Sequence, residues 1–196
     1  MNTRRTLAVL LATLVFYGCS RESSAAEYYP LTANSRWEYE TEISKSGGGV
    51  QKATVVVRIE GTAEIDKQTY YKEITLNKGV PGVPNQTNYR RLTPKGLYTR
   101  GETDPGSPEV LTLPFPPVVG HEWEVENIAM KIEAIESLKT GDKTYQDCLK
   151  VVSSWKLEND ESASLISYYA PDVGLVKSTL RVHGIVVEMR LSKHTK

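Results

Sequence analysis

The chain has 196 residues, and 24 lysine and arginine side chains balance 24 aspartate and glutamate side chains, so its formal net charge is zero. Domains that bind DNA or RNA carry basic stripes, whereas the isolated pair Arg90-Arg91 is typical of a solvated surface. We therefore expect no nucleic-acid partner. The length suits one domain, and tyrosine outnumbers phenylalanine 11 to 2, which favours β-strands because tyrosine fits a pleated, half-buried surface.

Residues 1–18 have the layout of a signal peptide. Arg4 and Arg5 make the start basic, and the run Leu7–Tyr17 that follows contains no charge. A membrane-spanning helix needs about 20 apolar residues, so this run is too short to remain in the bilayer as a span. We expect a signal helix that is removed on export.

The end of this apolar run resembles a bacterial lipobox, in which a small residue precedes a cysteine that becomes the acylated first residue. Gly18 and Cys19 match the pattern, whereas Phe16 and Tyr17 stand where it prefers leucine and a small residue. The resemblance implies several acyl chains on Cys19, and two or more chains make a lasting membrane anchor. The alternative is cleavage after 24–26, Ser-Ala-Ala, which would leave a soluble periplasmic or secreted protein.

The residues behind Cys19 give the expected location and domain limits. Ser20 stands where many Gram-negative lipoproteins of the inner membrane have aspartate, so the resemblance implies the outer membrane, with the protein on its periplasmic face. Residues 19–27 are small and polar, as in a flexible tether. Residues 28–196 are then expected to form one domain.

The rest of the chain alternates apolar and polar residues in the manner of β-strands. The clearest alternating runs are 37–43, 54–59, 69–76 and 184–191, and turn-forming residues separate them at 47–49, 66–67, 78–84, 94–96, 104–106, 140–142 and 159–161. Residues 127–139 fit both a helix and a strand, and their context favours a strand. The pattern predicts an all-β domain, an antiparallel meander forming a curved sheet, half-barrel or barrel after the N-terminal signal helix.

One internal echo is visible: residues 29–40 align without gaps with residues 115–126. Each segment opens with an aromatic residue and proline, continues through a turn, and enters a strand at Trp37-Glu or Trp123-Glu. The residues downstream of the two Trp-Glu pairs do not keep matching. We interpret the echo as two strand starts within one sheet, in which each tryptophan fills the interior, and not as duplication of the whole domain.

Signatures of enzymes and metal sites are absent from the sequence. His121, His183 and His194 have no partners at ligand spacing, and there is no Gly-x-Ser-x-Gly motif or phosphate-binding loop. Glutamates at 38, 40 and 42 and at 122, 124 and 126 alternate with apolar residues, as on a solvated outer face. Cys148 is expected to be a small core residue. We predict no enzyme, no metal and no cofactor.

Three motifs resemble the bacterial TapB and DUF3108-like envelope lipoproteins, and the similarity spans nearly the whole mature chain. They are Tyr28-Tyr-Pro-Leu31 with Trp37-x-Tyr39, Tyr145-x-Asp-Cys148-Leu-Lys-Val151, and residues 168–177, YYAPDVGLVK. Asn34 and Asp172 stand where the family usually has glycine. The resemblance implies an all-β fold and brings no established activity, and the third motif is expected to form a hairpin turn.

A curved antiparallel sheet can enclose an apolar groove. Six aromatic residues are predicted to line it: Trp37, Tyr39, Trp123, Trp155, Tyr168 and Tyr169. The leading hypothesis is therefore a lipid-anchored, non-enzymatic binding or assembly module that holds an apolar ligand. The alternative is an envelope scaffold without a cavity, which binds protein through sheet edges and the loops Val80–Pro84 and Thr103–Pro108. A hollow interior favours the first hypothesis, and a filled interior the second.

Overall fold

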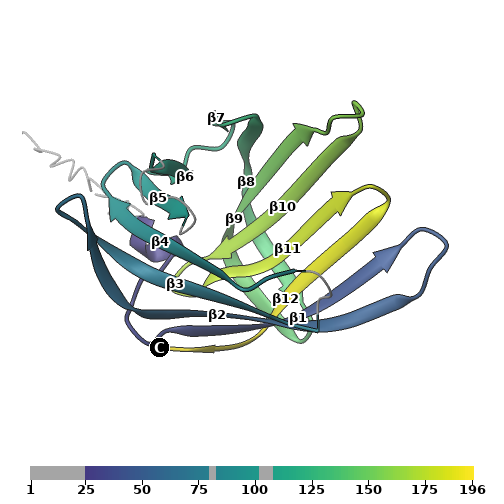
Figure 1. Ribbon diagram of the computed structural model, residues 1–196, viewed down its shortest axis with the longest axis horizontal. Helices are drawn as coiled ribbons and strands as arrows, with labels where there is room; N and C mark the ends of the chain where they lie inside the picture. Colours follow the sequence, from purple (N-terminus) through teal and green to yellow (C-terminus); the bar gives the residue numbers. More distant parts are fainter. Residues whose placement is uncertain (1–24, 80–82, 102–107) are drawn as a thin grey trace, which may run out of the picture.

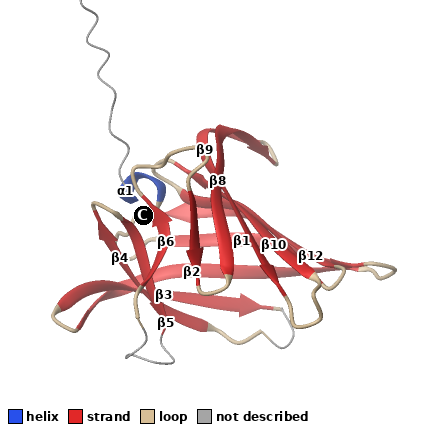
Figure 2. Ribbon diagram, turned by 90° about the horizontal axis from the view of Figure 1, so that it is seen from above, coloured by secondary structure: helices blue, strands red, loops and turns tan. Residues whose placement is uncertain are grey.

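The computed structural model describes residues 25–79, 83–101 and 108–196, which form a short helix and one sheet of twelve antiparallel strands (Figures 1 and 2). The elements are α1 (Ala25–Tyr28), β1 (Arg36–Lys45), β2 (Val50–Ile65), β3 (Gln68–Lys78), β4 (Gln86–Thr93), β5 (Gly96–Gly101), β6 (Val110–Pro114), β7 (Glu122–Val125), β8 (Ile128–Thr140), β9 (Lys143–Lys156), β10 (Ser162–Ala170), β11 (Gly174–Val182) and β12 (Ile185–Thr195). The sheet curls until it is nearly closed into a barrel, which confirms the predicted all-β antiparallel meander.

Several sequence expectations fall outside the described residues. The signal peptide 1–18, Cys19 and the tether up to residue 24 lie there, as do residues 80–82 and 103–107 of the two proposed contact loops. The last tether residues, 25–27, belong to α1. Among the described residues, no helix has the length and apolar character needed to cross a bilayer.

The sheet consists of two six-stranded meanders that meet at its centre. Its strand order is β6-β5-β4-β3-β2-β1-β12-β11-β10-β9-β8-β7, so the first strand of one meander pairs with the last strand of the other. The two outer strands, β6 and β7, are consecutive in the chain and face each other across the opening of the barrel. The indole of Trp123 on β7 bridges this opening by donating to the carbonyl oxygen of Leu111 on β6, at 3.2 Å.

The sequence echo marks equivalent starts of the two meanders, because one segment leads into β1 and the other into β7. The amide of Asn34 donates to the carbonyl oxygen of Ile59 at 3.0 Å, and the amide of Gly120 donates to that of Ile132 at 2.8 Å. Asn34 and Gly120 both have a positive φ, of 69° and 90°. The segments therefore start strands of one sheet, as predicted, and each also starts a structural half, which the diverging downstream sequences do not reveal.

The apolar residues of alternate positions form the inner face of the curved sheet. Trp37 and Tyr39 of β1 are buried, whereas Glu40, which follows Tyr39 and points to the other face of the strand, is exposed. Residues 128–140 form strand β8, as their context predicts. Cys148 on β9 is a buried free cysteine, which confirms its expected place in the core. Burial raises the pKa of its thiol to about 11.

The segment that follows the predicted tether closes one end of the barrel. Tyr28 and Leu31 are buried in the core, and the Tyr28 hydroxyl donates to the carbonyl oxygen of Asp147 at 3.0 Å. The ring centroid of Tyr28 lies 5.9 Å from that of Phe115, at the start of the β6–β7 loop. Tyr28 and Leu31 thus attach the N-terminal end of the described chain to the core of the domain.

Candidate functional site

The interior of the curved sheet holds a cavity of about 520 Å³, a size typical of small-molecule sites. It lies between β1 to β4 on one side and β10 to β12 on the other. Tyr29 and Pro30, from the segment after α1, also line it.

The wall formed by β3 and β4 is polar. Every second residue of β3 from Glu73 onward faces the cavity, and the paired positions of β4 do so as well, because alternate residues of a strand share one face. The lining residues of this wall are Glu73, Thr75 and Asn77 on β3 and Gln86, Asn88 and Arg90 on β4. Hydroxyl, amide and charged groups therefore line one side of the cavity.

The opposite wall and the floor are apolar and aromatic. The facing strands contribute Leu165 on β10, Leu175 and Leu180 on β11, and Met189 on β12, and the floor consists of Trp37, Tyr39, Val55 and Val57. The polar atoms of the floor are occupied: the Trp37 indole donates to the carbonyl oxygen of Val173 at 2.6 Å, and the Tyr39 hydroxyl donates to that of Leu175 at 3.0 Å. The floor consequently offers ring faces and not free hydrogen-bonding groups.

A buried ion pair lies at the deep end of the polar wall. The Arg90 guanidinium donates to Glu73 Oε1 from Nη2 at 2.8 Å and from Nε at 3.1 Å. The Tyr29 hydroxyl donates to the second oxygen, Glu73 Oε2, at 2.5 Å, and Arg90 Nη1 donates to the Thr99 hydroxyl at 2.5 Å. The Glu73 side chain is 2% exposed and that of Arg90 is 15% exposed. Both charges are therefore neutralised inside the protein.

Burial controls the ionisation of the groups around this pair. It raises the pKa of the Tyr29 and Tyr39 hydroxyls well above the usual value, and at Tyr29 the Arg90 charge opposes this effect while Glu73 adds to it. Burial alone would lower the pKa of the Arg90 guanidinium, but Glu73 and Tyr29 outweigh it and the pKa is raised. At neutral pH the tyrosines are neutral hydroxyls and Arg90 remains charged.

Half of the predicted groove residues lie at or beside this cavity. Trp37 and Tyr39 line it. Tyr169 lies next to it, with its ring centroid 6.3 Å from that of Tyr29. These three come from β1 and β10, strands that the sequence alone does not bring together.

The other three predicted residues lie elsewhere. Trp123 lines a second depression of about 520 Å³ on β7 to β9, and Trp155 lines a third of about 480 Å³. Tyr168 alternates with Tyr169 on β10, and the Lys150 ammonium lies 5.9 Å from its ring centroid. The six aromatic residues therefore do not share one groove in the structure.

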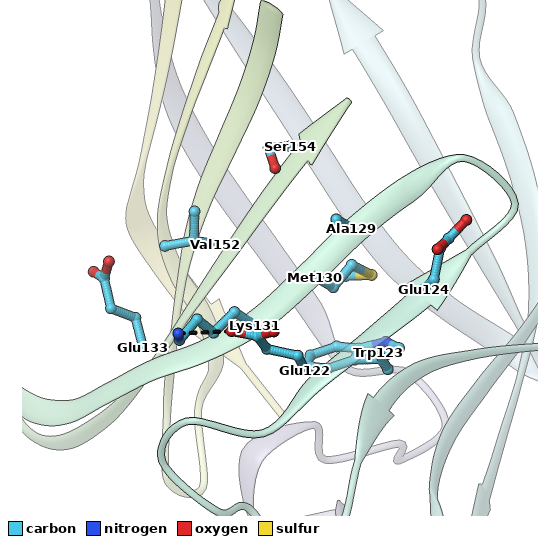
Figure 3. Close-up of a pocket in the computed structure, with 9 residues that line it drawn as sticks. All are labelled: Glu122, Trp123, Glu124, Ala129, Met130, Lys131, Glu133, Val152 and Ser154. Carbon is cyan, nitrogen blue, oxygen red and sulfur yellow. Dashed lines mark hydrogen bonds and ion pairs between the residues drawn. The ribbon is translucent and has the colours of Figure 1, made fainter. Parts of the chain in front are cut away.

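The second depression equals the interior cavity in volume but differs in chemistry. Figure 3 shows Lys131 paired with Glu122, at 2.7 Å between Nζ and Oε1, and Glu124 directed away from them. Both members of this pair are exposed, and water can replace either partner. The interior cavity, with its desolvated ion pair and its apolar wall, is the better candidate for a specific site.

The sequence interpretation did not identify Glu73, Arg90 or Tyr29. Glu73 lies in the alternating run 69–76, where Tyr70 and Ile74 occupy the opposite face of β3. The only signal in the sequence was that Glu73 alternates with Tyr70 and Ile74 along the strand, and that the next strand, β4, contains Arg90. Within the described ranges, no group of three or more histidine, cysteine, aspartate or glutamate side chains is placed to hold a metal ion.

The motif at residues 168–177 forms the predicted hairpin. Tyr168 and Tyr169 lie near the end of β10, Gly174 begins β11, and Gly174 has a φ of 94°. Asp172 and Asn34, which stand where the TapB and DUF3108-like motifs usually have glycine, have positive φ values of 61° and 69°. Aspartate and asparagine tolerate this left-handed conformation better than other side chains, so both departures preserve the backbone path.

Together these features define an open antiparallel β-barrel whose interior cavity has one polar and one apolar wall. No family model matches the chain, and no curated protein matches it. Its fold is similar to that of a candidate exported protein from Bacteroides fragilis with a YmcC-like fold, with 13% identity, 87% of this chain and 99% of that chain covered, and a TM-score of 0.57.

Two further solved structures show weaker similarity. A candidate lipoprotein from Parabacteroides distasonis has 13% identity, covers 86% of this chain and 98% of its own, and gives a TM-score of 0.42. A LolA superfamily protein from Nitrosomonas europaea has 9% identity, with 88% of this chain and 89% of that chain covered, and gives a TM-score of 0.39. At these identities only the fold shared with the first protein is established, and membership of the TapB and DUF3108-like family stays a prediction.

Proposed function

We propose that this protein is a lipid-anchored, non-enzymatic carrier of the bacterial cell envelope that holds an uncharged amphiphilic ligand in its interior cavity. The observation that carries this proposal is the cavity of about 520 Å³ with one polar and one apolar wall. The anchor is Cys19, and the proposed location is the periplasmic face of the outer membrane. A soluble or secreted form after cleavage behind Ala26 is the alternative.

The apolar part of the ligand is expected to lie against β10 to β12. Leu165, Leu180 and Met189 line this wall. Apolar surface transferred from water to such a wall stabilises a complex by about 25 cal/mol per Å² before the costs of association are subtracted. An acyl chain or a comparably apolar skeleton supplies this surface.

The polar part of the ligand is expected to be neutral. Glu73 and Arg90 already neutralise each other, and a ligand carboxylate would have to compete with Glu73 for the guanidinium while being repelled by it. The remaining polar residues of this wall are threonine, asparagine and glutamine. Their amides and hydroxyls suit an ester, amide or hydroxyl group of the ligand.

A titration with matched ligands and matched variants tests the proposal. Protein that begins after Cys19 is purified without detergent and titrated with a monoacylglycerol and with a fatty acid of the same chain length. We expect the monoacylglycerol to bind more tightly. Leu165→Trp fills the cavity and should weaken binding at least tenfold, whereas Ile166→Trp, on the opposite face of β10, should leave it unchanged.

Two outcomes of this titration would refute the carrier. If neither amphiphile binds, or if both tryptophan variants have the same effect, the cavity is not the binding site. If the fatty acid binds more tightly than the monoacylglycerol, the cavity is a carrier site but the proposed preference for a neutral head group is wrong.

An envelope scaffold that pairs with a partner strand is a second candidate, supported by an edge of the sheet. β7 pairs only with Ile128–Lys131, so among the described strands none covers the outer edge of β8 from Glu133 to Thr140. A free edge can accept a strand from another protein. Replacing Ile135 on this edge with proline would abolish such pairing and leave ligand binding in the cavity unchanged.

A further inference from the structure

The loop between β6 and β7 exposes apolar side chains that neither the core nor the cavity uses. Val118 and Val119 are 56% and 54% exposed, and Pro116 beside them is also exposed. Both ends of the loop are held by backbone hydrogen bonds, from the amide of Phe115 to the carbonyl oxygen of Lys95 at 2.9 Å and from the amide of His121 to that of Val118 at 3.0 Å. The valines are thus presented on an ordered loop.

This loop lies beside the point where the chain arrives from the predicted anchor. Phe115, its first residue, packs against Tyr28 of α1 with 5.9 Å between ring centroids. Only the segment 20–24 separates Cys19 from α1, and at 3.3 to 3.6 Å per residue the path from Cys19 to Ala25 is at most about 22 Å long. An acylated Cys19 therefore keeps the start of α1 within about 22 Å of the bilayer, and this loop begins in contact with that helix.

The exposed residues of the cavity lining lie at the other end of the barrel. β1 runs from the α1 end to the hairpin before Val50, and at about 3.4 Å per residue its ten residues cover about 30 Å. Figure 1 shows this hairpin at one extreme of the molecule and α1 towards the other. Val83, which lines the cavity and is 41% exposed, follows the end of β3 that is remote from α1, whereas the half-buried Tyr29 and Pro30 line the near end.

We infer that the segment Pro116–Gly120 rests on the lipid surface and orients the barrel so that the cavity opens away from the membrane. Exposed valines beside an acyl anchor gain apolar contact at the bilayer interface. Lys95, exposed next to this loop, suits the anionic head groups of an envelope membrane. The inference rests on the proposed acylation of Cys19 and is independent of the ligand in the cavity.

A pair of fluorescent labels tests the orientation. An environment-sensitive fluorophore is attached to Val119→Cys or, as the control, to Val50→Cys, in the acylated full-length mature protein. Val50 is 62% exposed but lies at the far hairpin. Cys148 is buried and the Cys19 sulfur is alkylated, so the introduced thiol is the reactive one. The vesicles contain phosphatidylethanolamine and phosphatidylglycerol at a ratio of about 3 to 1, chosen to give the anionic surface that attracts Lys95.

We expect the label at position 119 to shift to shorter wavelength on vesicles and to be quenched by a lipid-borne quencher, while the label at position 50 does neither. Equal responses at both positions, a response only at position 50, or no response at position 119 from protein that floats with the vesicles would overturn the inference. Intact mass and flotation report the anchor separately. A chain without acyl groups ends both the anchor proposal and this inference, whereas failed ligand binding affects neither.

Discussion

The ion pair between Glu73 and Arg90 gives a sharp test of how the cavity is built. The carboxylate is 2% exposed, and it accepts hydrogen bonds from both Arg90 and Tyr29. Arg90→Met leaves this carboxylate buried without its counter-charge, and Glu73→Leu leaves the guanidinium in the same position. We predict that each single substitution strongly destabilises the fold.

The size of the effect follows from desolvation. Removing one partner of a buried ion pair typically costs about 3 to 5 kcal/mol, and the 15% exposure of Arg90 places this pair at the lower end, about 3 kcal/mol. In a domain of this size that corresponds to a fall in Tm of about 6 to 12 °C. The double variant should cost less than either single one, because no buried charge remains and only the Tyr29 hydroxyl loses its acceptor.

Urea unfolding of the four proteins in this double-mutant cycle measures the effect. The matched control is Lys131→Met, which breaks the exposed pair with Glu122 and should not change the midpoint measurably. A cost below about 1 kcal/mol for each single substitution, or a double variant that costs the sum of the two single ones, would contradict this prediction.

Three further predictions concern the core. Gly174→Ala should destabilise the fold by about 1 to 2 kcal/mol, because Gly174 has a φ of 94° and a Cβ there would lie 3.5 Å from Trp37 Nε1. The control is Gly49→Ala, where a Cβ meets nothing within 4 Å, and it should leave the free energy of unfolding in urea unchanged. Trp37→Phe should cost about 1 to 3 kcal/mol, since the partly buried carbonyl of Val173 loses its donor; an unchanged Tm would contradict this. Burial raises the pKa of the Cys148 thiol to about 11 from an ordinary value of 9.0, so above pH 9 the thiol loses its proton more readily in the unfolded chain than in the folded one. The wild type should therefore lose stability relative to Cys148→Ala as the pH rises from 9 to 11. Parallel pH profiles of the two proteins would refute the burial of the thiol.

The strands and turns could be predicted because both depend on local sequence. The turn at Asp66-Lys67 separates β2 from β3, and both residues have a positive φ, of 52° and 62°. The pairing of β1 with β12 could not be predicted in this way, because Trp37 and His194 face each other across more than 150 positions of the chain. Nothing local identifies such a partner.

The site was predicted only where alternation was enough. Trp37 and Tyr39 are apolar residues in phase on a strand whose glutamates face outward, so their inward direction could be inferred. Glu73 faces inward on β3 although Tyr70 and Ile74 of the same strand are more apolar, because the curvature of the whole sheet decides which face is concave. Trp155 is an aromatic residue of the kind expected in the groove, but its place along β9 puts it in another depression.

The most direct test of the carrier is the identity of what the protein holds after purification. Wild-type protein beginning after Cys19 is isolated from the envelope fraction without detergent, together with Leu165→Trp and Ile166→Trp, and the extracted small molecules are measured by mass spectrometry. We expect an uncharged amphiphile in near-stoichiometric amount with the wild type and Ile166→Trp, and its loss with Leu165→Trp. An empty wild-type protein that also fails to take up a monoacylglycerol, or the same amphiphile retained by Leu165→Trp, would contradict it.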